Sequence, residues 1–150
     1  MTDIAVAESN LVLELSRRFD APPERVFDAW VTKDWCEWMG PAGSRCTLVA
    51  LDARIGGSFH LRMTLADGRV SEITGTYREL VRPERLSMVW GGDCTRFGTS
   101  LTVTFRRDGT GTLMTLCQEG LPDPTIRGNF ENGWAGVGCS FDRLAALLTR

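Results

Sequence analysis

The chain has few of the residues that metal binding and acid–base catalysis require, with a single histidine, His60, among 150 residues. Its cysteines are widely spaced and form no C-x-x-C pair; they are Cys36, Cys46, Cys94, Cys117 and Cys139. A zinc site needs about four such ligands, so neither a metal nor any other cofactor is expected. An odd number of scattered cysteines instead predicts reduced, partly buried thiols in a cytoplasmic protein.

The chain also lacks long apolar runs and blocks of positive charge. No segment approaches the ~20 apolar residues that a membrane-spanning helix needs. The net charge is −2. The sequence contains no cluster of basic residues of the kind that nucleic-acid binding requires. Residues 1–10 carry Asp3 and Glu8 but no basic residue, so they do not resemble a signal peptide. These residues are expected to be flexible, and residues 11–150 to form one domain.

The polar residues do not form a recognisable catalytic set, and no catalytic residue is predicted. His60 lies between Phe59 and Leu61, on the opposite face of its strand from both. If those two residues point inward, His60 points outward and is unavailable to a nucleophilic triad. The acids nearest to an expected cavity lie off the inward faces or in loops: Glu72, Asp93 and Glu119. Paired-carboxylate chemistry is therefore not predicted either.

Alternation of apolar and polar residues predicts a sheet of about six to seven strands. The expected strands cover residues 11–19, 46–53, 58–65, 70–80, 85–90, 101–106 and 112–118. Two short helices are expected after the first strand, over residues 24–32 and 34–39, and a loop from Gly91 to about Gly98. Short turns such as Asp67-Gly68 join successive strands, so the sheet should be antiparallel. Because the helices lie at the two ends of the chain and not between strands, the fold class is α+β.

Residues 122–148 predict one long C-terminal helix. Apolar residues recur there at helical steps: Ile126, Phe130, Trp134, Val137, Phe141, Leu144 and Leu148. Asp123 can cap the helix, and Pro124 suits its first turn. The same segment contains Gly128, Gly133, Gly136 and Gly138, and each glycine costs a helix interior roughly 1 kcal/mol relative to alanine. The missing side chains predict room for a close neighbour or for a cavity.

A helix of about 25 residues, roughly 38 Å long, can cross a curved sheet and leave a small-molecule cavity at its glycine-rich end. The proposed lining consists of the inward-facing residues Trp38, Phe59, Leu61, Met63, Ile73, Tyr77, Met88, Trp90, Val103, Met114, Leu116, Gln118, Phe130 and Trp134. An apolar wall with a few polar groups is typical of such sites, and Tyr77 and Gln118 could orient a ligand. The alternative for each apolar residue is packing in a solid core.

Several short motifs, in this order and spacing, resemble one known superfamily over residues 11–148. They are Phe19-Asp20-Ala21-Pro22-Pro23-Glu24-Arg25-Val26-Phe27, Trp38-Met39-Gly40-Pro41, Asp52-Ala53-Arg54-Ile55-Gly56-Gly57-Ser58-Phe59, Gly75-Thr76-Tyr77-Arg78-Glu79, Pro83-Glu84-Arg85-Leu86 and Gly133-Trp134. The chain resembles the SRPBCC proteins of the START and birch-pollen-allergen superfamily, and within it the bacterial homologues of the activator of the heat-shock-chaperone ATPase. The resemblance implies a helix-grip fold, in which the curved sheet wraps around the C-terminal helix. The sequence departs from the family pattern at Met39, where an aromatic residue is frequent, and at Gln118, where a histidine is common.

Three functions stay open at this point. The first is binding of a small hydrophobic or aromatic molecule in the cavity between sheet and C-terminal helix, in a stress or secondary-metabolite context. The second, which depends on the resemblance alone, is a chaperone co-factor or other protein-interaction module, and it predicts a sizeable exposed apolar patch. The third is a cyclase- or dehydratase-like enzyme that uses Tyr77 and Gln118 as polar contacts in the same cavity. A homodimer is compatible with the sequence, although no motif requires one.

Overall fold

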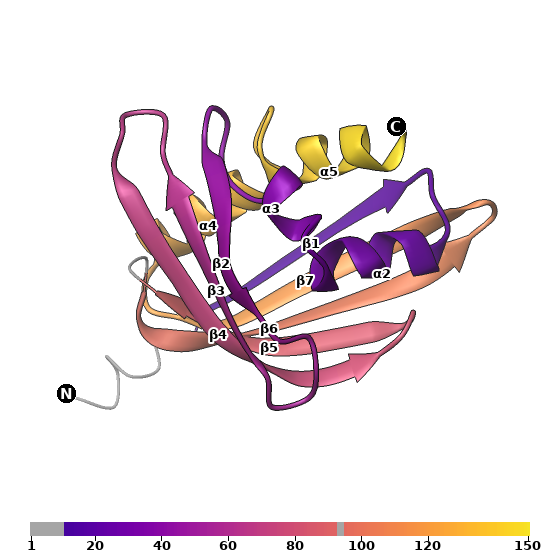
Figure 1. The fold of residues 1–150 in the computed structure, drawn as a ribbon, viewed down its shortest axis with the longest axis horizontal. Coiled ribbons are helices and arrows are strands. Elements are labelled where there is room, and N and C mark those ends of the chain that lie inside the picture. Colours follow the sequence, from indigo (N-terminus) through magenta and orange to yellow (C-terminus); the bar gives the residue numbers. More distant parts are fainter. Residues whose placement is uncertain (1–10, 93–94) are drawn as a thin grey trace.

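The computed structural model describes residues 11–92 and 95–150, which form a seven-stranded antiparallel sheet and four helices (Figure 1). The strands are β1 (Leu11–Phe19), β2 (Arg45–Leu51), β3 (Ser58–Thr64), β4 (Val70–Val81), β5 (Arg85–Gly92), β6 (Thr95–Asp108) and β7 (Gly111–Leu121). Their order across the sheet is β1-β7-β6-β5-β4-β3-β2. The helices are α2 (Pro23–Val31), α3 (Trp35–Trp38), α4 (Pro124–Ala135) and α5 (Ser140–Leu148). The predicted α+β helix-grip fold is confirmed. Residues 1–10, Asp93 and Cys94 lie outside the described residues.

The strands follow the alternation of the sequence. On β3, Phe59, Leu61 and Met63 are buried, while His60 and Arg62 lie on the outer face. The predicted outward position of His60 is confirmed: its Nε2 atom lies 2.6 Å from the Glu72 carboxylate on β4. The same alternation on the other strands gives the curved sheet one apolar face, and the helices lie against that face (Figure 1).

The loop predicted from Gly91 to about Gly98 is shorter in the structure. Strand β6 begins at Thr95, which pairs with Gly92 at the end of β5. A Cβ atom on Gly98 would lie 2.8 Å from the Val89 side chain of β5. This glycine, which suggested a loop, therefore lies in a paired strand where a side chain has little room.

The single long helix predicted over residues 122–148 is interrupted in the structure. Helix α4 ends at Ala135 and is capped by Gly136, and Gly138 has a φ of +72°, a left-handed conformation that glycine adopts without steric penalty. The Gly138 N–H donates to Asp142 Oδ2 over 2.7 Å and so secures the start of α5. Val137, predicted to belong to the buried face, lies in the interruption and is 94% exposed. Two of the four glycines thus end a helix instead of opening a cavity beside one.

Tryptophans fill the space between the helices and the sheet. Trp30 of α2 packs against Trp35 and Trp38 of α3 and against Trp134 of α4, with ring centroids 4.8–6.1 Å apart. Trp35 also packs on Trp90 of β5, 5.9 Å away. All five indoles are at most 2% exposed. Because aromatic side chains bury large areas, this cluster is the centre of the core, and little of the space under the helices is left empty at this end of the sheet.

Candidate functional site

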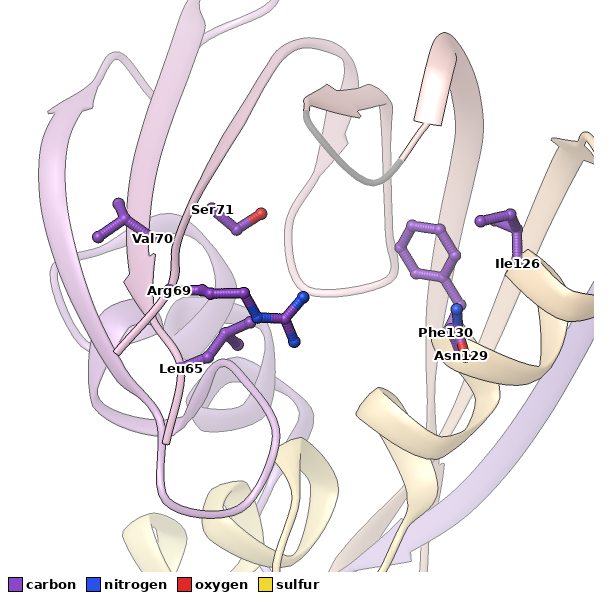
Figure 2. Close-up of a pocket in the computed structure, with 7 residues that line it drawn as sticks. All are labelled: Leu65, Arg69, Val70, Ser71, Ile126, Asn129 and Phe130. Carbon is purple, nitrogen blue, oxygen red and sulfur yellow. The ribbon is translucent and has the colours of Figure 1, made fainter. Parts of the chain in front are cut away.

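An open groove lies between the β3–β4 hairpin and helix α4, at the other end of the sheet from α2. Its volume is about 420 Å³, within the range of small-molecule pockets. Its walls come from the segment after α3, the hairpin, Trp90 of β5, α4 and the first residue of α5. They are Met39, Gly40, Pro41, Met63, Leu65, Arg69, Ser71, Ile73, Trp90, Asn129, Phe130, Asn132, Gly133, Trp134 and Ser140. An adjoining hollow of about 400 Å³ shares Leu65, Arg69, Ser71, Asn129 and Phe130 with the groove and adds Val70 and Ile126. Figure 2 shows the side chains that line this hollow.

The groove combines apolar walls with one cationic side chain at its rim. In Figure 2, Arg69 and Phe130 lie on opposite sides, and the guanidinium points toward the ring. Arg69 follows the Asp67-Gly68 turn, and its Nε–H donates to Asp67 Oδ2 over 2.7 Å. The backbone N–H and the guanidinium of Arg69 both bond to the Asp67 carboxylate and hold its pKa below the ordinary value. The Arg69 side chain is 76% exposed, so its guanidinium is accessible at the groove, where it can meet an anionic group.

Part of the predicted lining reaches this groove. Met63, Ile73, Trp90, Phe130 and Trp134 all contribute to its walls. The other proposed residues are packed in the core, each at most 1% exposed, and do not contribute to those walls: Trp38, Phe59, Leu61, Tyr77, Met88, Val103, Met114, Leu116 and Gln118. For these residues the alternative of core packing agrees with their burial in the structure.

The two polar residues predicted to orient a ligand are engaged by the fold itself. The Tyr77 hydroxyl donates to the Trp30 carbonyl over 3.3 Å, and burial raises the pKa of this phenol. Gln118 Nε2–H donates to the Thr99 hydroxyl over 2.9 Å, and its Oε1 accepts from the Trp134 indole N–H over 3.2 Å. Gln118 therefore acts on the groove only through Trp134, whose ring it positions in the wall.

The groove also contains residues that the sequence reasoning did not select, namely Met39, Gly40, Pro41, Leu65, Arg69, Ser71, Asn129, Asn132, Gly133 and Ser140. Of these only Gly133 gave a signal, because glycines in the C-terminal helix had suggested a cavity. A Cβ atom on Gly133 would meet no atom within 4 Å, which agrees with that expectation. The polar residues gave no such signal in the sequence, because polar residues are common on the exposed surfaces of strands and helices.

The N-terminal turn of α5 holds one wall of the groove. The Gly40 N–H donates to the Ser140 hydroxyl over 2.9 Å, and that hydroxyl donates to the Gly40 carbonyl over 3.2 Å. Arg143 Nη1 lies 3.2 Å from the Ser44 hydroxyl and 3.4 Å from the Met39, Gly40 and Pro41 carbonyls. Residues 39–44, which have no regular structure, are therefore fixed in place from α5.

Within residues 11–92 and 95–150, no group of three or more His, Cys, Asp or Glu side chains is placed to hold a metal ion. Across the same part of the chain, no helix has the length and apolar character to cross a bilayer.

A curved antiparallel sheet closed by C-terminal helices, with a groove between them, is the helix-grip architecture of the SRPBCC superfamily. The family model of the Activator of Hsp90 ATPase homolog 1-like proteins matches residues 20–149. The chain belongs to this family, as its motifs had suggested. Membership identifies a domain type that in general binds ligands, but it does not name a ligand.

Solved structures share the fold over nearly the whole chain. Protein CV1439 from Chromobacterium violaceum is 29% identical, with 93% of this chain and 97% of that chain covered and a TM-score of 0.82. The AHSA1 protein from Silicibacter pomeroyi is 24% identical, covers 93% of this chain and 98% of its own, and gives a TM-score of 0.77. CalU16 from Micromonospora echinospora is 20% identical, with coverages of 93% and 77% and a TM-score of 0.70. The last two likenesses concern the fold alone. No curated protein sequence matches the chain.

Proposed function

We propose that this protein binds a small apolar or aromatic molecule in the groove between the β3–β4 hairpin and α4. The observation that carries the proposal is a space of about 420 Å³ bordered by the apolar side chains of Met63, Ile73, Trp90 and Phe130. Apolar walls of this size suit a molecule of one or two rings, because removing its surface from water is favourable at about 25 cal/mol per Å².

The rim favours a ligand that also carries a negative group. The Arg69 guanidinium keeps donors beyond the Nε–H that Asp67 accepts, and it borders the same space as the Phe130 ring. A guanidinium can hold a carboxylate or sulfonate through paired hydrogen bonds. An amphipathic aromatic acid, with its ring against Phe130 and its acid group at Arg69, satisfies both parts of the site.

The other two functions have less support. The enzyme hypothesis relied on Tyr77 and Gln118, and both side chains are packed in the core and do not border the groove. The chaperone hypothesis predicts a sizeable exposed apolar patch. The exposed large apolar residues in the described part of the chain are spread over β1, β2, both ends of β4, β7 and two connecting segments: Val12, Val49, Ile55, Val70, Val81, Leu113 and Val137.

The test is binding of 8-anilinonaphthalene-1-sulfonate, an aromatic anion whose fluorescence rises in apolar surroundings. Gly133→Leu places a side chain in the groove, and Gly128→Leu is the matched control in the same helix. An added Cβ meets nothing within 4 Å at either glycine, but only Gly133 belongs to the groove walls. We expect Gly133→Leu to weaken binding at least tenfold and Gly128→Leu to leave it unchanged. Equal binding by both variants, with unchanged near-ultraviolet circular dichroism, would overturn the proposal.

A second arm tests the charge. Arg69→Gln should weaken binding of the sulfonate and leave binding of an uncharged naphthalene unchanged. Loss of both would assign Arg69 a structural role. Native mass spectrometry of the purified protein, followed by denaturing extraction, would then identify the class of any compound that the protein retains.

A further inference from the structure

Two cysteines that are ten residues apart in sequence are brought together beside the groove. Cys36 belongs to α3 and Cys46 to β2, and their sulfur atoms lie 3.0 Å apart, with the Cys46 thiol donating to Cys36. Both residues are half-buried and pack against the core. The sequence predicted reduced, partly buried thiols and gave no sign that these two meet.

The fold holds the two sulfurs close through elements other than the cysteines. Helix α3 is anchored by Trp35, which packs between Phe59 and Trp90. Strand β2 is held by its pairing with β3, in which Cys46 lies opposite Met63. The connecting residues 39–44 are fixed by Ser140 and Arg143 of α5. A disulfide has an S–S length of about 2.0 Å, so the two sulfurs lie about 1 Å further apart than in a formed bond.

The environment differentiates the two thiols. The hydrogen bond from the Cys46 thiol holds the pKa of Cys36 below its ordinary value, against the opposing effect of burial. The same hydrogen bond, together with burial, raises the pKa of Cys46. Because the thiolate is the reactive form of cysteine, Cys36 is the more nucleophilic partner and Cys46 retains its proton.

We propose that Cys36 and Cys46 form a dithiol site that is oxidised by hydrogen peroxide and reduced again by a small thiol. The Cys36 thiolate attacks one peroxide oxygen, the O–O bond breaks, and Cys36 becomes a sulfenic acid while the released hydroxide takes a proton to form water. The Cys46 sulfur then attacks the Cys36 sulfur, the S–O bond breaks, and a second water leaves with the Cys46 proton. Two thiols have lost two electrons and peroxide has gained them. Two equivalents of a thiol such as glutathione reverse the reaction by disulfide exchange.

The other described cysteines lack this arrangement. Cys117 lies on β7, and burial together with the nearby Glu119 and Glu14 carboxylates raises the pKa of its thiol. Cys139 is buried, and its sulfur accepts the Ala42 N–H. Neither has a second thiol as a hydrogen-bond partner among the residues that the structure describes. They serve as internal controls for the reactivity of the pair.

The test is peptide mapping of the full-length protein after exposure to one equivalent of peroxide and alkylation of the remaining thiols. Trypsin cleaves after Lys33, Arg45 and Arg54, so Cys36 and Cys46 fall in the separate peptides 34–45 and 46–54. We expect these two peptides to be joined, with the loss of two hydrogens, and to separate after dithiothreitol treatment. Cys117→Ser should not change the yield of the joined peptides.

Two variants test the order of events. In Cys46→Ser, oxidation of Cys36 should stop at the sulfenic acid, which dimedone traps, and in Cys36→Ser, Cys46 should remain a thiol at the same peroxide dose. Alkylation of Cys36 by iodoacetamide near pH 7 should be several-fold faster in the native protein than in Cys46→Ala. The proposal is overturned if peroxide oxidises all cysteines equally, if Cys36 joins another cysteine, Cys94 included, in preference to Cys46, or if Cys46→Ala leaves the alkylation rate unchanged.

Discussion

The buried hydrogen-bond chain under the groove gives a quantitative test of how the structure is held together. Gln118 accepts from the Trp134 indole and donates to Thr99, whose hydroxyl donates to the Trp90 carbonyl over 3.1 Å. Gln118→Leu keeps a similar volume but leaves the indole N–H of Trp134, which is 1% exposed, without its acceptor. A buried donor that loses its partner costs about 1–3 kcal/mol. At about 2–4 °C per kcal/mol for a chain of this length, we expect Tm to fall by about 2–12 °C.

A double-mutant cycle separates this effect from a change in packing. Trp134→Phe alone removes the indole N–H, leaves the Gln118 oxygen unpaired and loses some apolar volume. Because Gln118→Leu with Trp134→Phe removes both polar partners, the double variant should be more stable than the sum of the single effects predicts, by about 1 kcal/mol or more. Urea unfolding followed by far-ultraviolet circular dichroism measures all four proteins. Additivity within about 0.5 kcal/mol would show that the two side chains are not energetically coupled and would refute the reasoning.

Three further predictions concern the sheet, α5 and the outer surface. Gly75→Ala should destabilise the protein by about 1–3 kcal/mol or more in urea unfolding, because the added methyl would overlap a carbonyl of β5. An unchanged free energy of unfolding would contradict the close approach of β4 and β5. Leu144→Ala should cost about 2–5 kcal/mol, since the side chain is fully buried, whereas Val137→Ala, in the exposed interruption, should stay within about 0.5 kcal/mol. The Arg62 guanidinium and a neighbouring histidine hold the pKa of Glu72 below its ordinary value. The stabilisation by the ionised Glu72 is therefore full above about pH 4.3, the value for an unfolded glutamate, and is lost as the pH falls through the lowered folded-state pKa. The difference in urea midpoint between the native protein and Glu72→Gln should shrink over that interval, and a difference independent of pH would contradict this assignment.

The sequence predicted which face of a strand is buried but not what covers each position along it. Phe59 and Met63 both point inward on β3, as their alternation with His60 and Arg62 indicates. Trp35 packs on Phe59 at a ring separation of 5.0 Å, so Phe59 is part of the core. Met63, four residues further along, borders the groove. The difference depends on the reach of α3, a tertiary property that periodicity does not encode.

The cysteine pair was missed for a related reason. The sequence separation of Cys36 and Cys46 gives no indication that they meet, because residues 37–45 include a helix end, Gly40, Pro41 and Gly43. Gly40 and Gly43 both adopt positive φ values, which turn the chain back on itself between α3 and β2. The glycines and the proline indicated a break in the chain, but the direction in which the chain continues is determined by contacts with α5.

The interruption of the C-terminal helix is the departure from prediction that contributes most to the site. Ser140 is the first residue of α5, and its hydroxyl bonds both backbone groups of Gly40. In one continuous helix the backbone N–H of Gly138 would bond a carbonyl four residues earlier. In the structure it bonds the Asp142 carboxylate instead. The same carboxylate pairs with Arg17 of β1 over 2.6 Å. The break lets α5 start independently of α4 and fasten residues 39–41 beside the groove. The glycines of this segment therefore act at two places: Gly133 leaves the groove open from α4, and Gly138 lets α5 hold its opposite wall.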